Sequence, residues 1–297
     1  MQINKIKKRF IIGSWSWDGY KPTTYKEALS AIDILLENGF NEFDTSPSYG
    51  RGEEILAKLK KKNKEIIINT KCGIDRNFQK SFKKKDLIKG INLSLKKFGK
   101  INVLQLHNPR KEKLENIYEI IDLFNQYKKK KLIKFTGISL ARDAYFPMKI
   151  LNSFDFIQDE FNLLRIDPLK KMKNYKGTLA ARSIYANGIL TKKFNLKSTF
   201  SKKDHRASWL KNQRLKNIYN QKKLLSDLTK EKIEKFSLDF VLRFKMFNKI
   251  IVGVRTKKQV EDFLRNIDNS KKIEKKNIKK IIDLHKNNAF FNSEEKY

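Results

Sequence analysis

The sequence predicts an α/β fold: a closed (β/α)8 TIM barrel with extra helices between strands seven and eight and a C-terminal helix. Three observations predict it. Short β-rich runs alternate with longer segments of helical period, there are eight such runs, and the 297 residues suit one barrel domain. The chain has no linker rich in Pro, Gly or Ser, so residues 1–297 are expected to form a single domain.

The predicted strands are short segments rich in Ile, Val, Phe and Thr, the side chains that a pleated sheet favours. Strands that alternate with helices pair in parallel, and eight of them can close the sheet. The eight segments are residues 10–14, 41–45, 65–71, 101–107, 135–139, 156–161, 178–183 and 250–254.

The predicted helices lie between these strands. In residues 24–38, Leu29, Ile32 and Leu36 form one apolar stripe, and Asn38-Gly39 ends the helix. Residues 184–249 are too long for one connection and are expected to hold extra helices, one of them at 231–247. The other predicted helices are residues 53–61, 85–98, 114–129, 141–152, 169–174, 257–267 and, after the last strand, 273–286.

The formal net charge of +35 raises the question of a nucleic-acid partner. Lysines occur in every predicted helix and in both halves of the chain, whereas a binding site needs them clustered on one face. Lys, Asn, Ile and Phe are all used heavily here, and these are residues that an AT-rich genome favours. We therefore expect no specific nucleic-acid partner, and we attribute the charge to composition.

The single cysteine, Cys72, excludes an intrachain disulfide and a metal site made of several cysteines. This cysteine usage fits a reducing cytoplasm, and no metal is expected. No apolar segment reaches the length of a membrane span, so no membrane partner is expected.

Titratable side chains stand where three successive predicted strands end. Asp44 closes the second strand, Lys71 the third and His107 the fourth, and Tyr49 lies in the loop just after Asp44. Functional groups of such barrels gather at the carboxyl ends of the strands, and neighbouring strands are about 4.8 Å apart. These four side chains are therefore expected to meet in one small volume.

A lysine between an aspartate and a tyrosine has a chemical use. The lysine charge stabilises the phenolate and so is expected to lower the pKa of Tyr49, while Asp44 holds the ammonium in place. Tyr49 is then the candidate general acid, and His107 the group that orients a substrate oxygen. Trp15 and Trp17, just after the first strand, are candidates for lining the substrate mouth or, equally, for core packing.

Other features of the sequence favour structural roles. Gly50 and Gly52 resemble the start of a Rossmann phosphate loop, but Ile55 stands where that fingerprint needs its third glycine. His205 lies in the long connection and His285 in the terminal helix, away from the strand ends, so surface or packing roles are expected for both.

The sequence resembles the aldo-keto reductase family over nearly its whole length. The pattern Gly-Phe-x-x-Phe-Asp-Thr-Ser-x-x-Tyr-Gly at 39–50 is followed by Thr-Lys at 70–71 and Leu-x-Leu-His at 104–107. The resemblance continues with Gly-Ile-Ser, Gln-x-x-Phe-Asn, Asn-Gly-Ile-Leu-Thr and Val-Gly-Val-Arg, which begin at 137, 158, 187 and 252. By this resemblance the catalytic tetrad of the family falls on Asp44, Tyr49, Lys71 and His107.

The resemblance implies NADPH, or less often NADH, bound across the carboxyl-terminal face of the barrel. Ser139 and Gln158 would hold the nicotinamide carboxamide, and the segment with Gly253, Arg255 and Gln259 would bind the adenosine phosphate end. Arg255 could pair with a 2′-phosphate in a forked geometry, so NADPH is the cofactor we favour.

The sequence departs from the family pattern at three positions. Leu140 replaces the Asn that commonly follows the serine of strand five, and Phe263 stands where an Asn often contacts adenine. Arg182, before Ser183, stands where many members place an aromatic ring against the nicotinamide; a guanidinium plane can also stack.

The resemblance implies an oxidoreductase that reduces an aldehyde or ketone to an alcohol. The short connection after His107 suggests an open mouth, and hence a sugar or sugar derivative as the small-molecule carbonyl substrate. The alternative is a cofactor-binding barrel that acts as a non-catalytic regulatory or interaction subunit.

Overall fold

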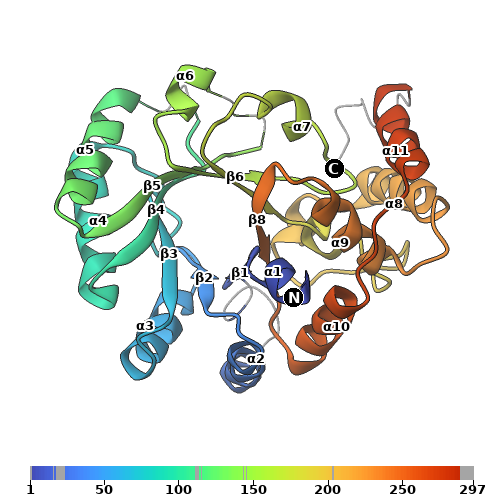
Figure 1. The fold of residues 1–297 in the computed structure, drawn as a ribbon, viewed down its shortest axis with the longest axis horizontal. Coiled ribbons are helices and arrows are strands. Elements are labelled where there is room, and N and C mark those ends of the chain that lie inside the picture. Colours follow the sequence, from blue (N-terminus) through green and yellow to red (C-terminus); the bar gives the residue numbers. More distant parts are fainter. Residues whose placement is uncertain are drawn as a thin grey trace.

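Eight parallel strands close into a barrel in sequence order, because β1 pairs with β8 as well as with β2. The computed structural model describes residues 2–15, 17, 24–110, 114, 116–142, 144, 146–202 and 204–287. Figure 1 shows the ring of strands with helices outside it. The predicted barrel is therefore confirmed, and the Rossmann alternative is wrong.

Each predicted strand corresponds to an observed one, with boundaries that differ by a few residues. Most residues of these strands are buried on the inner as well as the outer face of the sheet, as in other barrels. The strands are β1 Phe10–Gly13, β2 Glu42–Asp44, β3 Ile67–Cys72, β4 Ile101–His107, β5 Ile133–Ser139, β6 Phe156–Glu160, β7 Thr178–Arg182 and β8 Phe247–Val252.

The helices follow the predicted alternation and include an unpredicted short one, α1, before the first strand. The predicted extra helices between β7 and β8 are α8 and α9, accompanied by two short 3-10 turns. The helices are α1 Gln2–Lys7, α2 Tyr25–Glu37, α3 Gly52–Lys62, α4 Lys84–Phe98, α5 Ile117–Lys129, α6 Met148–Leu151, α7 Pro168–Lys171, α8 Asn212–Ser226, α9 Ile233–Arg243, α10 Lys257–Asp268 and α11 Lys275–Asn287. The 3-10 turns are η2 Ala186–Gly188 and η3 His205–Ser208.

Two predicted helices are shorter than expected. The helix predicted at 141–152 is reduced to α6, since Pro147 disfavours a helical conformation at the residue before it. The helix predicted at 231–247 ends at Arg243, and β8 already begins at Phe247. The side chain of Arg9 donates hydrogen bonds to main-chain carbonyls of residues 242, 244 and 247, which satisfies the end of the helix.

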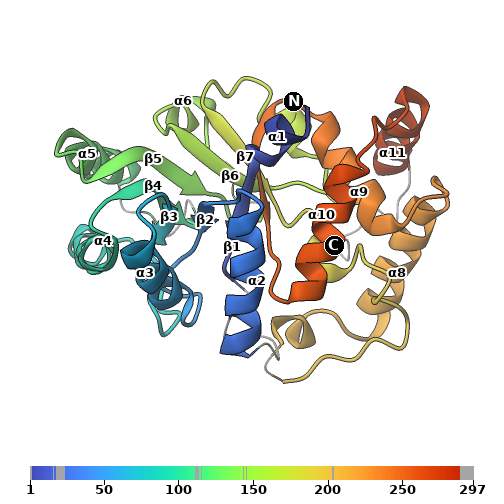
Figure 2. The same ribbon diagram turned by 60° about the horizontal axis from the view of Figure 1, so that its bottom comes forward.

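Helices pack against each other at the seam of the barrel, where β8 pairs with β1. In Figure 2, α2 and α10, which come from opposite ends of the chain, lie side by side, and residues of the two helices are in contact. Within the described ranges no helix combines the length and the apolar character that crossing a membrane would require.

The barrel interior has an apolar floor beneath a polar layer. Its floor is a separate cluster of Ile11, Val103, Phe156, Ala180 and Ile251. Because side chains alternate along a strand, every second residue points inward. Two and four residues beyond Val103, β4 therefore turns Gln105 and then His107 toward the carboxyl-terminal mouth. The fold thus places polar side chains in layers that rise toward one end of the barrel.

Candidate active site

A buried ion pair between Asp44 and Lys71 forms the base of the site. Asp44 is the last residue of β2 and Lys71 the last but one of β3. The Lys71 ammonium binds the Asp44 carboxylate and also donates to the carbonyl oxygen of Thr45 at 2.9 Å. The Lys71 side chain is 0% exposed and the Asp44 side chain 3%. A buried charge needs a partner of opposite sign, and each of these two side chains provides that partner for the other.

Tyr49 stands above the ammonium. The Nζ atom of Lys71 lies 4.6 Å from the centre of the Tyr49 ring. The loop that carries Tyr49 closes tightly: its amide donates to the carbonyl oxygen of Ser46 at 3.0 Å, and α3 begins at once with Gly52. A Cβ at Gly52 would lie 2.7 Å from Oγ of Ser14, so the close approach requires glycine.

The pKa of Tyr49 differs from the sequence expectation. Burial of the phenol raises this pKa, and the charge of Lys71 and its hydrogen bond lower it by less. The expected net lowering was therefore wrong for the protein alone, because removing the phenolate from water outweighs the nearby ammonium. Tyr49 is consequently protonated at neutral pH, with a cation beside it that stabilises the phenolate it would become.

His107 completes the group of four. Burial, aided by the charge of Lys71, lowers its pKa well below the usual 6.5, so the imidazole is neutral at neutral pH. Its Nδ1 lies 3.1 Å from Oγ of Ser46, and the ring packs edge-on against Tyr49 with centroids 5.7 Å apart. When Nδ1 accepts from Ser46, the remaining ring nitrogen carries the hydrogen and can donate it to a bound oxygen.

A cavity of about 1010 Å³ opens over these residues and extends to the segment after β8. Asp44, Tyr49 and His107 line one end of it, while Lys71 lies beneath. The predicted cofactor residues that line it are Gln158, Arg182, Ser183, Gly253, Arg255 and Gln259. Ser139 does not line it, but donates a hydrogen bond to Gln158 at 3.4 Å.

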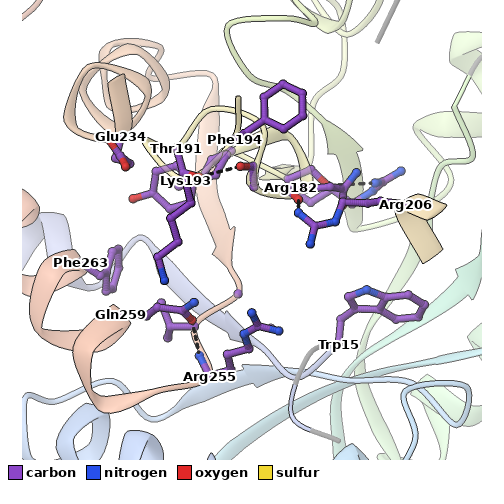
Figure 3. A pocket seen from close by; sticks show the side chains of 18 of the residues that line it. Trp15, Arg182, Thr191, Lys193, Phe194, Arg206, Glu234, Arg255, Gln259 and Phe263 are labelled. Carbon is purple, nitrogen blue, oxygen red and sulfur yellow. Dashed lines mark hydrogen bonds between the residues drawn. The ribbon is translucent and has the colours of Figure 1, made fainter. Parts of the chain in front are cut away.

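The far end of the cavity suits a phosphate. Figure 3 shows the side chains of Arg255 and Lys193 pointing into the open space. Among the described residues, Nη1 of Arg255 is buried without a hydrogen-bond partner, and burial lowers the pKa of this guanidinium. An orphaned donor of this kind fits an anionic ligand that supplies the missing acceptors. The residues present therefore fit the phosphate end of a nicotinamide cofactor.

The three departures from the family pattern have clear positions. Leu140 is fully buried, and its carbonyl oxygen accepts a hydrogen bond from Arg182 at 2.9 Å. Arg182 lines the cavity, with its Nη1 3.8 Å from Oε2 of Glu160. Phe263 lines the other end, where its ring packs edge-on against Phe10 with centroids 5.0 Å apart.

The two tryptophans have different positions. Trp15 lines the cavity and packs edge-on against Tyr49, with ring centroids 4.9 Å apart. Trp17 is 0% exposed and donates from Nε1 to the carbonyl oxygen of Val254 at 2.9 Å. Of the two roles left open for Trp17, core packing is the one observed and lining of the mouth is wrong, because this ring is buried in the core.

His205 lies at the cavity, although the sequence placed it far from the strand ends. The connection from β7 to β8 folds back over the mouth, so that His205 lines the cavity with its ring 5.8 Å from that of Trp15. Arg206 beside it binds Asp204 through two contacts of 2.6 and 3.0 Å and donates to the carbonyl oxygen of Asn187. Asp204, which caps η3, is a local signal, but nothing in the sequence gives the path of the connection. His285 has a packing contact, 2.8 Å from the carbonyl oxygen of Leu163.

The chain is similar to proteins of known family over most of its length. Residues 9–285 match the model of the aldo/keto reductase family. An uncharacterized oxidoreductase, YqkF of Bacillus subtilis (strain 168), is 30% identical over 187 residues, 58% of this chain and 60% of that protein. A chloroplastic pyridoxal reductase of Arabidopsis thaliana is 35% identical over 77 residues, 20% of this chain and 21% of that protein. The matches thus span less than two thirds of either relative.

Solved structures share the fold at low sequence identity. A glycerol dehydrogenase from Gluconobacter oxydans is 21% identical with a TM-score of 0.74, over 94% of this chain and 91% of that one. An aldo-keto reductase from Bacillus halodurans is 20% identical with a TM-score of 0.74, over 93% and 91%. In the part of the chain that the structure describes, no three His, Cys, Asp or Glu side chains group as metal ligands.

Proposed function

The chain belongs to the aldo/keto reductase family, and from that premise we propose that it reduces an aldehyde or ketone with hydride from NADPH while Tyr49 donates the proton. Family membership makes the protein an oxidoreductase of the carbonyl-reducing type. The finer assignment of the cofactor, the proton donor and the substrate is our proposal.

One observation carries the assignment of the proton donor. Tyr49 lies above the Lys71 ammonium, with 4.6 Å between Nζ and the ring centre, and both line or underlie the same cavity. A general acid must hold a proton at the working pH and must become a stabilised anion when it releases that proton. Burial provides the first property and the lysine charge the second.

Each member of the group has a defined task in this proposal. Tyr49 gives its proton to the carbonyl oxygen as the carbonyl carbon is reduced, so the product is the alcohol. Lys71 stabilises the phenolate that remains, and Asp44 keeps the ammonium charged and in place. His107, neutral and held by Ser46, donates a hydrogen bond that orients the carbonyl oxygen.

The cofactor site is proposed from residues along the cavity. When bound, NADPH supplies the hydride. Gln158 and Ser139 would hold the carboxamide beside the group of four, and Arg255 would bind the 2′-phosphate that distinguishes NADPH from NADH. The unpaired guanidinium nitrogen of Arg255 favours NADPH over NADH.

The test is an NADPH-oxidation screen with a broad panel of carbonyl compounds, run with Tyr49→Phe as the matched variant. The substitution keeps the ring against Trp15 and His107 and removes the hydroxyl. We expect turnover to fall by at least about 100-fold while the Kd for NADPH, measured by fluorescence, stays within about threefold of the wild type. Undiminished turnover in Tyr49→Phe would refute the assignment.

For the substrate we propose a sugar or sugar derivative. Polar side chains at the catalytic end of the cavity support this class, among them Asn108, whose Oδ1 is buried without a partner among the described residues. The panel should pair hydroxylated aldehydes with aromatic aldehydes and should include pyridoxal, because one relative is a pyridoxal reductase. Activity confined to aromatic aldehydes would contradict the sugar proposal.

The alternative is a non-catalytic subunit that binds the cofactor. Leu140 stands where the family commonly has Asn, and the side chain of a leucine cannot hydrogen-bond a carboxamide. This difference favours the non-catalytic alternative. Tight NADPH binding with no turnover over the whole panel would support this alternative and reject the reductase.

A further inference from the structure

We propose that Gln105 is a positioning residue of the reaction: its side-chain amide holds Asp44, and through Asp44 it holds the Lys71 ammonium beneath Tyr49. The inference rests on the proposed function, because it assigns a task toward the proton donor named there. Gln105 itself lies under the cavity and is not among the residues that line it.

Both the nitrogen and the oxygen of the Gln105 side-chain amide form hydrogen bonds. Its Nε2 donates to Oδ1 of Asp44 at 3.0 Å, and its Oε1 accepts from Nε2 of Gln158 at 3.2 Å. Gln158 also donates to Oδ1 of Asp44, at 3.1 Å. The Asp44 carboxylate is thus fixed by two amides on one oxygen and by the Lys71 ammonium on the other.

The fold makes room for Gln105 at this position. Gln105 is 0% exposed and stands in register with Gly137 on the neighbouring strand β5. A Cβ at Gly137 would lie 2.9 Å from Cγ of Gln105 and 3.0 Å from Cγ1 of Val103. The glycine therefore leaves the space that the long polar side chain occupies in the barrel interior.

Gln105 has a task that Gln158 cannot perform alone. Gln158 lines the cavity and, in the proposed function, turns its amide toward the cofactor, which takes a donor away from Asp44. Gln105 lies on β4, in register with Lys71 on β3, and does not line the cavity. It keeps its hydrogen bond to Asp44 whether or not the cofactor is bound. The ion pair under Tyr49 then stays fixed when the cofactor binds.

The test replaces the amide with an apolar chain of similar length, Gln105→Met, in the full-length protein. We expect kcat to fall about 10- to 100-fold, as when a reacting group is misplaced by about 1 Å, while the Kd for NADPH stays within about threefold. The solvent deuterium isotope effect on kcat should rise, because proton donation becomes more rate-limiting. The basic limb of the pH profile should move to higher pH, since a looser Lys71 lowers the pKa of Tyr49 less.

Leu104→Met is the matched control, because Leu104 is buried on the same strand and points to the opposite side. It should leave the isotope effect and the pH limb unchanged. A measurement without turnover uses nuclear magnetic resonance of the Lys71 ammonium, whose protons should exchange with water faster in Gln105→Met than in Leu104→Met. Gln105→Asn serves as the second variant if Gln105→Met folds poorly. Its side chain is one methylene shorter and its amide does not reach Asp44, so the same kinetic changes are expected.

The outcomes separate this inference from the proposed function. If wild-type turnover depends on Tyr49 but Gln105→Met and Gln105→Asn keep the wild-type kcat, isotope effect and ammonium exchange, the role of Gln105 is refuted and the reductase stands. If the wild type reduces no carbonyl compound, the proposed function fails, and the role in catalysis fails with it. A lower melting temperature with unchanged kinetic values would assign Gln105 a purely structural role and overturn the inference.

Discussion

Lys71 and Tyr49 form a close cation and ring pair, with Nζ 4.6 Å from the ring centre, although they come from different strand units. Lys71 is the last but one residue of β3, whereas Tyr49 lies in the loop after β2. Burial raises the pKa of the phenol and the ammonium lowers it, so the protonation of Tyr49 depends on the balance of two opposed effects.

Lys71→Met should abolish most of the turnover and also destabilise the protein. The substitution leaves Asp44 buried without its ionic partner, a loss of about 3–5 kcal/mol in the free energy of unfolding, and removes the charge that stabilises the phenolate. Lys97→Met is the control, because Lys97 pairs at 2.7 Å with Glu53, which is 3% exposed and lies outside the cavity lining. The control should lose stability without losing kcat per folded molecule; equal losses of kcat in the two variants would contradict the prediction.

His107 should make stability depend on pH in the acidic range. Because its folded pKa lies well below 6.5 and its unfolded pKa is about 6.5, the unfolded chain takes up a proton that the folded one refuses. The free energy of unfolding should therefore decrease as the pH falls below about 6.5. Urea unfolding between pH 8 and pH 5 measures this slope, and His107→Gln, which cannot take up that proton, should show a smaller one. The same slope in both proteins would disprove the effect.

Arg255→Ala should weaken NADPH binding selectively. A charged hydrogen bond contributes about 1.5–3 kcal/mol, so the Kd for NADPH should rise about 10- to 150-fold, while the Kd for NADH should change little. Lys257→Ala is the control, because Lys257 is nearby but 67% exposed and outside the cavity lining. Titration of cofactor fluorescence measures both values. A wild type that binds NADH more tightly would refute the preference for NADPH.

Gly52→Ala should destabilise the start of α3, where the Tyr49 loop ends. The added methyl group would lie 2.7 Å from Oγ of Ser14, and overpacking of this kind costs about 1–3 kcal/mol. The Cβ added by Gly90→Ala in α4 would have no neighbour within 4 Å. This substitution should instead stabilise the protein by about 0.4–1 kcal/mol, because it restricts the unfolded chain. Urea unfolding compares the two variants, and a loss of stability in Gly90→Ala would show that the difference is not steric.

The strand order and the positions of Asp44, Lys71 and His107 were predictable because they depend on local patterns. A β-rich run ends at a definite residue, and a parallel barrel brings those ends to one mouth. The boundary between α9 and β8 was predicted wrongly. There, the carbonyl groups are satisfied by Arg9, more than two hundred residues away in the sequence.

The surroundings of Gln105 and His205 could not be predicted, because they depend on contacts between distant segments. In the sequence, Gln105 is one polar residue in a largely apolar strand. Only the folded chain places it beside Gly137 and within hydrogen-bond distance of Asp44. His205 reaches the cavity because a long connection folds back over the mouth. Trp17 shows the converse, since a residue close in sequence to Trp15 is sent into the core.

The sequence alone determined the architecture, the family resemblance and the meeting of Asp44, Tyr49, Lys71 and His107, since the period of a helix or strand and the residue at which a strand ends are properties of short segments. The tertiary structure decided the charge states, because burial depends on everything packed around a group. The sequence suggested a lowered pKa for Tyr49 from the nearby lysine. Exclusion of water by the folded chain is the larger effect, and it keeps the phenol protonated.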